Sequence, residues 1–189
     1  MVKTNIIICG LGGQGILFMT KIMAQSALNK GYKVMGAETH GMAQRGGSVI
    51  SHLRLGNVSS SLVRMGSAHL MLALEESEGY RFLPFLRNGG HLYIDADPDS
   101  FPMEAVKSYI EQKRLTCRAL PAGEIAHELD SPRSANLVQL GFFSAFADEP
   151  MTAETLKETI DQVSPDRFKE INLRAFDAGL EQGLNQKDQ

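Results

Sequence analysis

The sequence is poor in cysteine. Its 189 residues include only Cys9 and Cys117, whereas an iron–sulfur cluster held by cysteine alone needs about four thiolates. This chain therefore lacks the ligands for such a cluster. Both cysteines lie in apolar, strand-like segments, and structural disulfides are rare in the cytosol. We expect two free thiols buried in the core.

The sequence also lacks an excess of positive charge and any long apolar run. Its formal net charge is -3 and no basic stripe stands out, which argues against nucleic acid as the main partner. No apolar run approaches the roughly 20 residues that a membrane-spanning helix needs, and no signal-peptide pattern is present at the N-terminus. We expect a cytoplasmic protein that binds neither nucleic acid nor membrane.

Complete catalytic motifs are missing as well. The sequence has no G-x-S-x-G elbow, no P-loop lysine and no paired catalytic cysteine and histidine. The histidines show no metal-ligand spacing with one another or with a cysteine. We therefore expect no catalytic residue and no metal site on this chain. The histidines are His40, His52, His69, His91 and His127.

The most informative feature that is present is a glycine-rich turn at residues 10–15. It has the pattern G-x-G-x-x-G and lies between an apolar, strand-like run and a helix-period segment. Such a turn lets the backbone approach an anion at the N-terminus of the following helix. The candidate binding residues in this turn are Gly10, Gly12, Gly13, Gln14 and Gly15.

A second polar, glycine-rich stretch occupies residues 38–48. Glycines allow backbone N–H groups to point together, and the arginine in this stretch can bind a carboxylate or phosphate with two hydrogen bonds. We interpret the stretch as a binding surface for an anionic ligand or a partner subunit. Its candidate residues are Glu38, Thr39, His40, Gln44, Arg45, Gly46, Gly47 and Ser48.

The rest of the pattern predicts one domain over residues 1–189, with a three-layer, mostly parallel, Rossmann-like α/β fold and a helical C-terminal part. Strands that are apolar throughout suit a parallel sheet covered on both faces. We expect strands at 4–9, 32–38, 68–74, 91–95 and 115–120, and helices at 15–30, 103–113, 124–129 and 136–147. Further helices are expected after Glu75, Thr152 and Ser164.

Residues 48–55 alternate only partly between apolar and polar side chains, which predicts a half-exposed strand. Gly56-Asn57 suits a two-residue hairpin turn. We therefore expect residues 58–61 to return as a second arm, so that a hairpin is inserted on one edge of the sheet.

Three carboxylates, Glu75, Asp95 and Asp97, follow predicted strands, at the edge where open α/β sheets bind ligands. Glu38 ends the second strand, near the place where dinucleotide-binding folds keep a carboxylate for the ribose. A free-standing NAD(P)- or FAD-binding oxidoreductase is therefore one reading of the sequence.

The two glycine-rich stretches together resemble the gamma subunit, or gamma domain, of 2-oxoacid:ferredoxin oxidoreductases. Within that family the sequence of residues 38–49 is most similar to the small (beta) subunit of the indolepyruvate enzymes. Further matches are Ala73-Leu74-Glu75, Pro121 with Ile125, and Asn136 with Gly141. The resemblance adds Asn136 to Glu75 as a secondary site candidate.

The resemblance implies an enzyme complex that oxidatively decarboxylates a 2-oxoacid to its acyl-CoA, with coenzyme A as co-substrate and ferredoxin as electron acceptor. It implies thiamine diphosphate, magnesium and iron–sulfur clusters. This sequence lacks the diphosphate motif and the cysteines for them, so we expect these cofactors on a large catalytic (alpha) subunit. The glycine-rich loops are expected to pack on that partner.

Two alternatives stay open beside this interpretation. One is the free-standing nucleotide-dependent oxidoreductase, and the other is a pure interaction scaffold whose glycines are only structural. The sequence does not name the 2-oxoacid or the stoichiometry, and an isolated chain could form a homodimer through the surface meant for its partner.

Overall fold

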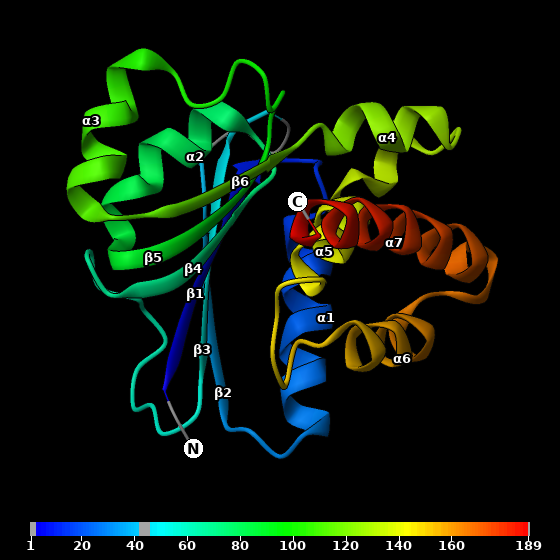
Figure 1. Ribbon diagram of the computed structural model, residues 1–189. Helices are drawn as coiled ribbons and strands as arrows, with labels where there is room; N and C mark the ends of the chain where they lie inside the picture. Colours follow the sequence, from blue (N-terminus) through cyan, green and yellow to red (C-terminus); the bar gives the residue numbers. More distant parts are fainter. Residues whose placement is uncertain (1–2, 42–45, 189) are drawn as a thin grey trace.

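The computed structural model describes residues 3–41 and 46–188 and is built around a six-stranded sheet. Figure 1 shows the sheet edge-on, between two layers of helices. The strand order is β2-β3-β1-β4-β5-β6. The strands are β1 (Thr4–Leu11), β2 (Val34–His40), β3 (Ser48–Leu55), β4 (Ala68–Ala73), β5 (Leu86–Asp95) and β6 (Thr116–Leu120).

Strands β1, β4, β5 and β6 run parallel, whereas β3 runs antiparallel to both β1 and β2. The expected β-α-β unit is therefore interrupted, because β3 lies between β1 and β2. This position also explains why β3 is buried along almost its whole length. The prediction of a half-exposed strand was wrong: His52 and Arg54 lie inside the sheet, with only 5% and 7% of their surface exposed.

The inserted hairpin exists, but its arms are β2 and β3, which the second glycine-rich stretch connects in sequence. The expected return arm at residues 58–61 is not a strand. Arg54 explains the difference, because its guanidinium donates to the backbone carbonyls of Ser60 (2.7 Å) and Leu62 (3.2 Å). It holds this segment as a loop over the amino end of the sheet.

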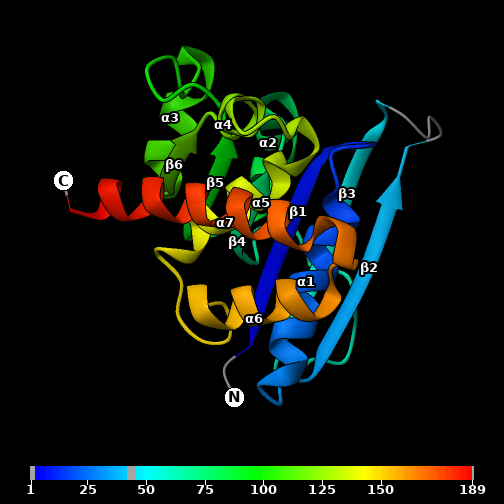
Figure 2. The ribbon, with the colours of Figure 1, turned by 90° about the vertical axis from the view of Figure 1, so that its right-hand side faces the viewer.

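The helices confirm the three-layer expectation. α2 and α3 cover one face of the sheet, and α1 with α4 to α7 covers the other (Figures 1 and 2). Most bounds agree with the prediction within a few residues. The helices are α1 (Ile16–Asn29), α2 (Glu76–Phe82), α3 (Glu104–Lys113), α4 (Ala122–Glu128), α5 (Ala135–Ser144), α6 (Ala153–Val163) and α7 (Asp166–Lys187).

α5 and α7 cross in close contact through glycine. A side chain at Gly141 would lie 2.8 Å from the carbonyl carbon of Phe176, and one at Gly179 would lie 2.7 Å from that of Val138. Phe168 and Leu184 of α7 are both about half exposed. The sequence interpretation did not identify the glycine contact, which decides how this helix packs.

Three smaller differences concern the parallel half of the sheet and the last helix. β5 begins at Leu86 rather than at residue 91 and continues through Gly89 and Gly90, with an irregularity in its pairing to β4. α7 begins at Asp166, so that Pro165 rather than Ser164 precedes its first residue. Cys9 and Cys117 are both free, as expected, but Cys117 is only partly buried. Within the described part of the chain, no helix is long and apolar enough to cross a membrane.

Candidate functional site

The two glycine-rich loops form one continuous edge. The N–H of Gly12 donates to the carbonyl of Gly47 (2.8 Å), and the N–H of Gly46 donates to the carbonyl of Gly12 (3.1 Å). These bonds extend the β1–β3 ladder beyond its last pair, Leu11 with Ser48. The first turn and the base of the second loop therefore act as one backbone unit. Gln44 and Arg45 lie outside the described residues.

The first turn is filled by one of its own side chains. Gln14 Oε1 accepts from the N–H of Leu11 (2.6 Å), and Gln14 Nε2 donates to Glu75 Oε2 (3.2 Å). Gly10 makes room for this, because a side chain there would lie 2.5 Å from the Gln14 amide oxygen. β1 leads to α1 on one face and β4 leads to α2 on the other. Gln14 and Glu75 thus span the crevice where open α/β sheets bind ligands.

The end of the turn is fixed by α5. Gly15 has a left-handed backbone (φ 81°) and stands just before the first residue of α1. Asn136 is buried and donates from Nδ2 to the Gly15 carbonyl (3.1 Å). The structure thus brings both secondary candidates, Glu75 and Asn136, to the first glycine loop. The N-terminus of α1 presents N–H groups without helical partners and a partial positive charge.

Glu38 lies away from this turn. It pairs with Ser51 of β3, which stands between β2 and β1. Its carboxylate is 3.7 Å from His40 Nε2, and both side chains are exposed. In a dinucleotide-binding fold the ribose carboxylate follows the strand next to β1. The interposed strand removes that geometry and weakens the reading of a free-standing nucleotide-dependent enzyme. Thr39, beside them, is exposed and paired with Ile50.

Glu78 forms a hydrogen bond with Ser48, at the base of the second loop. This α2 residue is buried, accepts a hydrogen bond from Ser48 Oγ and pairs with Arg81 Nε at 3.1 Å. Burial, and then the Glu78 charge, raise the pKa of the Cys9 thiol. The sequence pattern does not single out Glu78. Its spacing from the strand before it gave no signal of burial.

Asp95, at the carboxyl end of β5, lines a neighbouring cavity of about 290 Å³ with Gln14, Arg133 and Asn136. It accepts from the N–H of Gly123 at 3.2 Å. Burial raises the pKa of this carboxyl to about 6, against the lowering effect of the N–H groups at the start of α4. Asp97 accepts from the N–H of Asp99 in an exposed turn and takes no part in the cavity.

Replacing Asp95 by asparagine is expected to stabilise the chain above pH 6. Because the folded state holds the proton more tightly than the unfolded state, stability falls as pH rises from about 4 to 6 and stays low above that. The amide of the variant cannot ionise, so the gain at pH 7.5 should be about 1–2 kcal/mol and should vanish near pH 4. Thermal melts at both pH values measure it. Asp97→Asn removes the same charge in an exposed turn, and an equal gain there would contradict the assignment.

An apolar groove of about 640 Å³ runs beside the two loops. It lies between the first turn of α1 and the end of the hairpin. Leu17, on its wall, leaves 46% of its surface exposed. An apolar groove continuous with a polar glycine edge is typical of a surface that a partner covers. The groove residues are Leu11, Gly12, Gly13, Gly15, Ile16, Leu17, Phe18, His40, Gly41 and Val49.

The pyruvate ferredoxin/flavodoxin oxidoreductase family model matches residues 5–182. The chain belongs to this family. The indolepyruvate oxidoreductase subunit IorB of Archaeoglobus fulgidus is 33% identical to it over an alignment that covers 97% of this chain and 96% of that protein. The resemblance stated from the two glycine-rich stretches is thereby confirmed.

Solved structures of lower sequence identity share the fold. The gamma subunit of a keto/oxoacid ferredoxin oxidoreductase from Geobacter sulfurreducens superposes with a TM-score of 0.76 at 24% identity, covering 96% of this chain and 99% of that one. A 2-oxoglutarate:ferredoxin oxidoreductase from Magnetococcus marinus gives 0.77 at 22% identity. There the match covers 97% of this chain and 31% of the other, so the same fold also occurs as part of a longer chain.

Proposed function

We propose that this chain is the small, cofactor-free subunit of a 2-oxoacid:ferredoxin oxidoreductase, and that its glycine edge docks on the catalytic subunit. The observation that carries the proposal is the hydrogen-bonded edge made by Gly12, Gly46 and Gly47, with an apolar groove beside it. Family membership supports the reaction class, the oxidative decarboxylation of a 2-oxoacid to its acyl-CoA. The name of the Archaeoglobus relative favours indolepyruvate or a related substrate.

The residues of this chain do not fit the cofactors of that reaction. Cys9 lies in β1 and Cys117 in β6, with two strands between them. Within residues 3–41 and 46–188, no group of three or more histidine, cysteine or acidic side chains is placed to hold a metal ion. Thiamine diphosphate, magnesium and the iron–sulfur clusters therefore belong, in our proposal, to a large partner subunit, which also passes electrons to ferredoxin.

The role we assign to the glycine edge is to complete the partner's site. The free N–H groups at the start of α1 can hold an anionic group of the substrate or of coenzyme A, and Arg45 is proposed to act beside them. The Magnetococcus enzyme was solved with coenzyme A bound. The polar candidates of the second loop, from Glu38 to Ser48, then contact either that anion or the partner.

Leu17→Glu tests the docking surface. A charge on the wall of the groove must be desolvated when a partner covers it, so affinity for the catalytic subunit should fall at least about tenfold. The measurement is co-purification and titration of the two subunits, together with 2-oxoacid turnover by the complex. Leu28→Glu is the matched control, because Leu28 is on the same helix and similarly exposed (51%) but does not line the groove.

If Leu17→Glu and Leu28→Glu bound the catalytic subunit equally well and gave equal turnover, the proposed docking surface would be contradicted. Arg45→Ala separates docking from site completion: in our proposal it lowers turnover of the assembled complex more than it lowers assembly. Normal turnover by a fully assembled Arg45→Ala complex would favour the scaffold reading instead.

A further inference from the structure

The opposite end of the sheet, over the amino ends of β1 and β4 and the middle of β5, holds another cavity that the glycine edge does not explain. Its volume is about 310 Å³, within the range of small-molecule sites. Side chains that pair in register across neighbouring strands project to the same face. The rows Ile6–Leu70–His91 and Tyr93–Arg118 therefore share the face that α5 and α7 cover. The loop from Phe146 to Met151 roofs this part of the face.

The wall of the cavity is aromatic. The ring of Tyr93, only 3% exposed, lies 5.1 Å from the ring of Phe143 and 5.9 Å from that of Phe146 (centroid distances). Leu70 and Ile6 supply the aliphatic part of the floor. Flat aromatic groups pack best on such edge-on rings, so the shape and composition favour a planar ring as occupant.

A cation lies at one end of the aromatic wall. The guanidinium of Arg118 stacks on Phe146 at 4.2 Å from the ring centroid. No carboxylate of residues 3–41 or 46–188 forms an ion pair with it. Arg118 lines a second hollow of about 340 Å³, which shares His91, Tyr93 and Phe146 with the first and also contains Lys187. Arg118 also hydrogen-bonds the hydroxyl of Tyr93, and its remaining in-plane N–H groups are available for a carboxylate.

Two histidines, His69 and His91, add hydrogen-bonding groups to the lining. The N–H of Asn5 donates to Nδ1 of His69 (3.0 Å), so a neutral His69 carries its proton on Nε2. Burial is the main cause that lowers the pKa of both His69 and His91, which keeps the rings neutral near pH 7. Two carboxylates also line the cavity: Glu149 is paired with Lys30 at 3.1 Å, and Asp148 is exposed to solvent.

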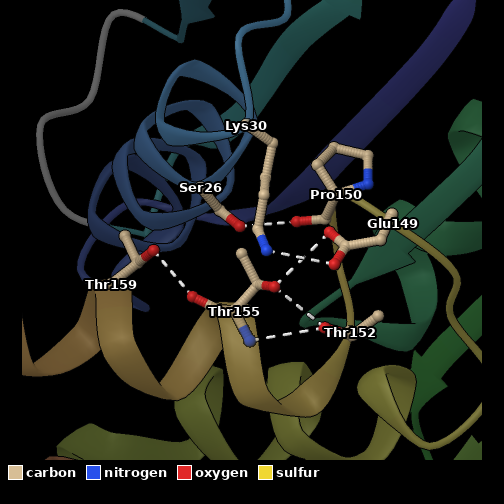
Figure 3. A network of polar contacts seen from close by, with 7 residues as sticks. All are labelled: Ser26, Lys30, Glu149, Pro150, Thr152, Thr155 and Thr159. Atoms are coloured by element: carbon tan, nitrogen blue, oxygen red, sulfur yellow. Dashed lines mark hydrogen bonds and ion pairs between the residues drawn. The ribbon is translucent and has the colours of Figure 1, made fainter.

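The loop that roofs the cavity is held in place before any ligand arrives. Figure 3 shows Ser26 of α1 donating to the carbonyl of Pro150, at 2.6 Å, and Glu149 tied to Lys30 and Thr155. Thr152 caps α6 by accepting from the N–H of Thr155 (3.3 Å). A roof fixed to two helices is a preformed site, which binds without the entropy cost of ordering a loop.

We propose that this cavity binds a small planar aromatic carboxylate, with its ring against Tyr93, Phe143 and Phe146 and its carboxylate on Arg118. The site is at the opposite edge of the sheet from the glycine loops, so its occupant is a second ligand of this chain. The proposal is independent of which subunit the glycine edge meets.

The probe is phenylacetate, titrated into the ¹⁵N-labelled full chain and followed by amide chemical shifts. Saturable shifts are expected around His91, Tyr93 and the roof loop. Acetate lacks the ring and phenylacetamide lacks the charge, so each should bind about tenfold more weakly or worse. Absence of saturable shifts, equal binding of acetate, or shifts confined to the Gly10–Gly15 edge would overturn the proposal.

Arg118→Met keeps a side chain on Phe146 but removes the charge, and should weaken phenylacetate about tenfold. Phe146→Leu keeps an apolar wall without the ring and is the second variant should the first fail to fold. Arg133→Met, a cation of the opposite edge beside Asp95, is the matched control and should leave binding unchanged. Unchanged affinity in Arg118→Met, or equal loss in Arg133→Met, would contradict the assignment.

Discussion

Alanine at Gly179 is expected to destabilise the chain by about 3 kcal/mol or more, which lowers the melting temperature by roughly 10 °C. The added methyl group would lie 2.7 Å from the carbonyl carbon of Val138 and 2.9 Å from the backbone nitrogen of Phe142. Both are backbone atoms of α5, so the contact is relieved only if the helices move apart. Alanine at Gly141 meets α7 in the same way, at Phe176.

Gly123→Ala is the matched control for this prediction. Gly123 is also helical, but a methyl group there would lie 3.6 Å from the Asp95 carboxylate, an ordinary contact. Alanine is the better helix former by about 1 kcal/mol, so the control should be neutral or stabilised. Chemical denaturation of all three variants measures the effect. A loss below about 1 kcal/mol at Gly179 would show that the helices separate easily.

Alanine at Gly15 is expected to cost about 2–3 kcal/mol, from two separable causes. The first is the left-handed backbone, with φ at 81°. The second is Asn136, whose amide nitrogen would lie 2.5 Å from the new methyl group. Displacing this amide breaks its hydrogen bond to the Gly15 carbonyl and loosens α5 from the glycine turn.

Two further variants separate the causes. Gly31→Ala has a similar φ of 77° and no atom within 4 Å of the added methyl group, so it measures the backbone cost alone. In the double variant Gly15→Ala/Asn136→Ala the clash is gone, and its loss should be smaller than the sum of the two single losses by about 1 kcal/mol. The free energy of unfolding is measured by denaturant titration. If the losses of the two single variants simply add in the double variant, Asn136 does not clash with the methyl group at position 15.

The layers and most element positions could be predicted because β1, β4 and α5 are mostly apolar. The meeting of the two glycine-rich stretches was also predictable, because both follow strands of one sheet. The hairpin was misplaced because Gly56-Asn57 has the residues of a good local turn. The buried Arg54 holds the segment after it as a loop instead of a return arm.

Other features depend on contacts between residues far apart in the sequence. Gly141 and Gly179 are small residues in apolar helices, and nothing local indicates that each faces the other's backbone. Glu78 follows a strand as helix-starting acids commonly do, and its burial arises from the position of Ser48 in another strand. The cavity over Tyr93 is formed by four strands, a helix and a loop, so no single stretch of sequence could show it.

The side chain of Gln14 has one more consequence for the glycine turn. The N–H of Leu11 already donates a hydrogen bond to Gln14 Oε1. An anion that binds this N–H must therefore displace the side chain of Gln14, which is covalently attached to the same turn. A tethered group acts at an effective concentration on the order of millimolar or higher. A free anion that needs this donor must exceed that concentration or bring other contacts with it. The turn is therefore biased against free phosphate and favours a ligand that a partner surface holds in place.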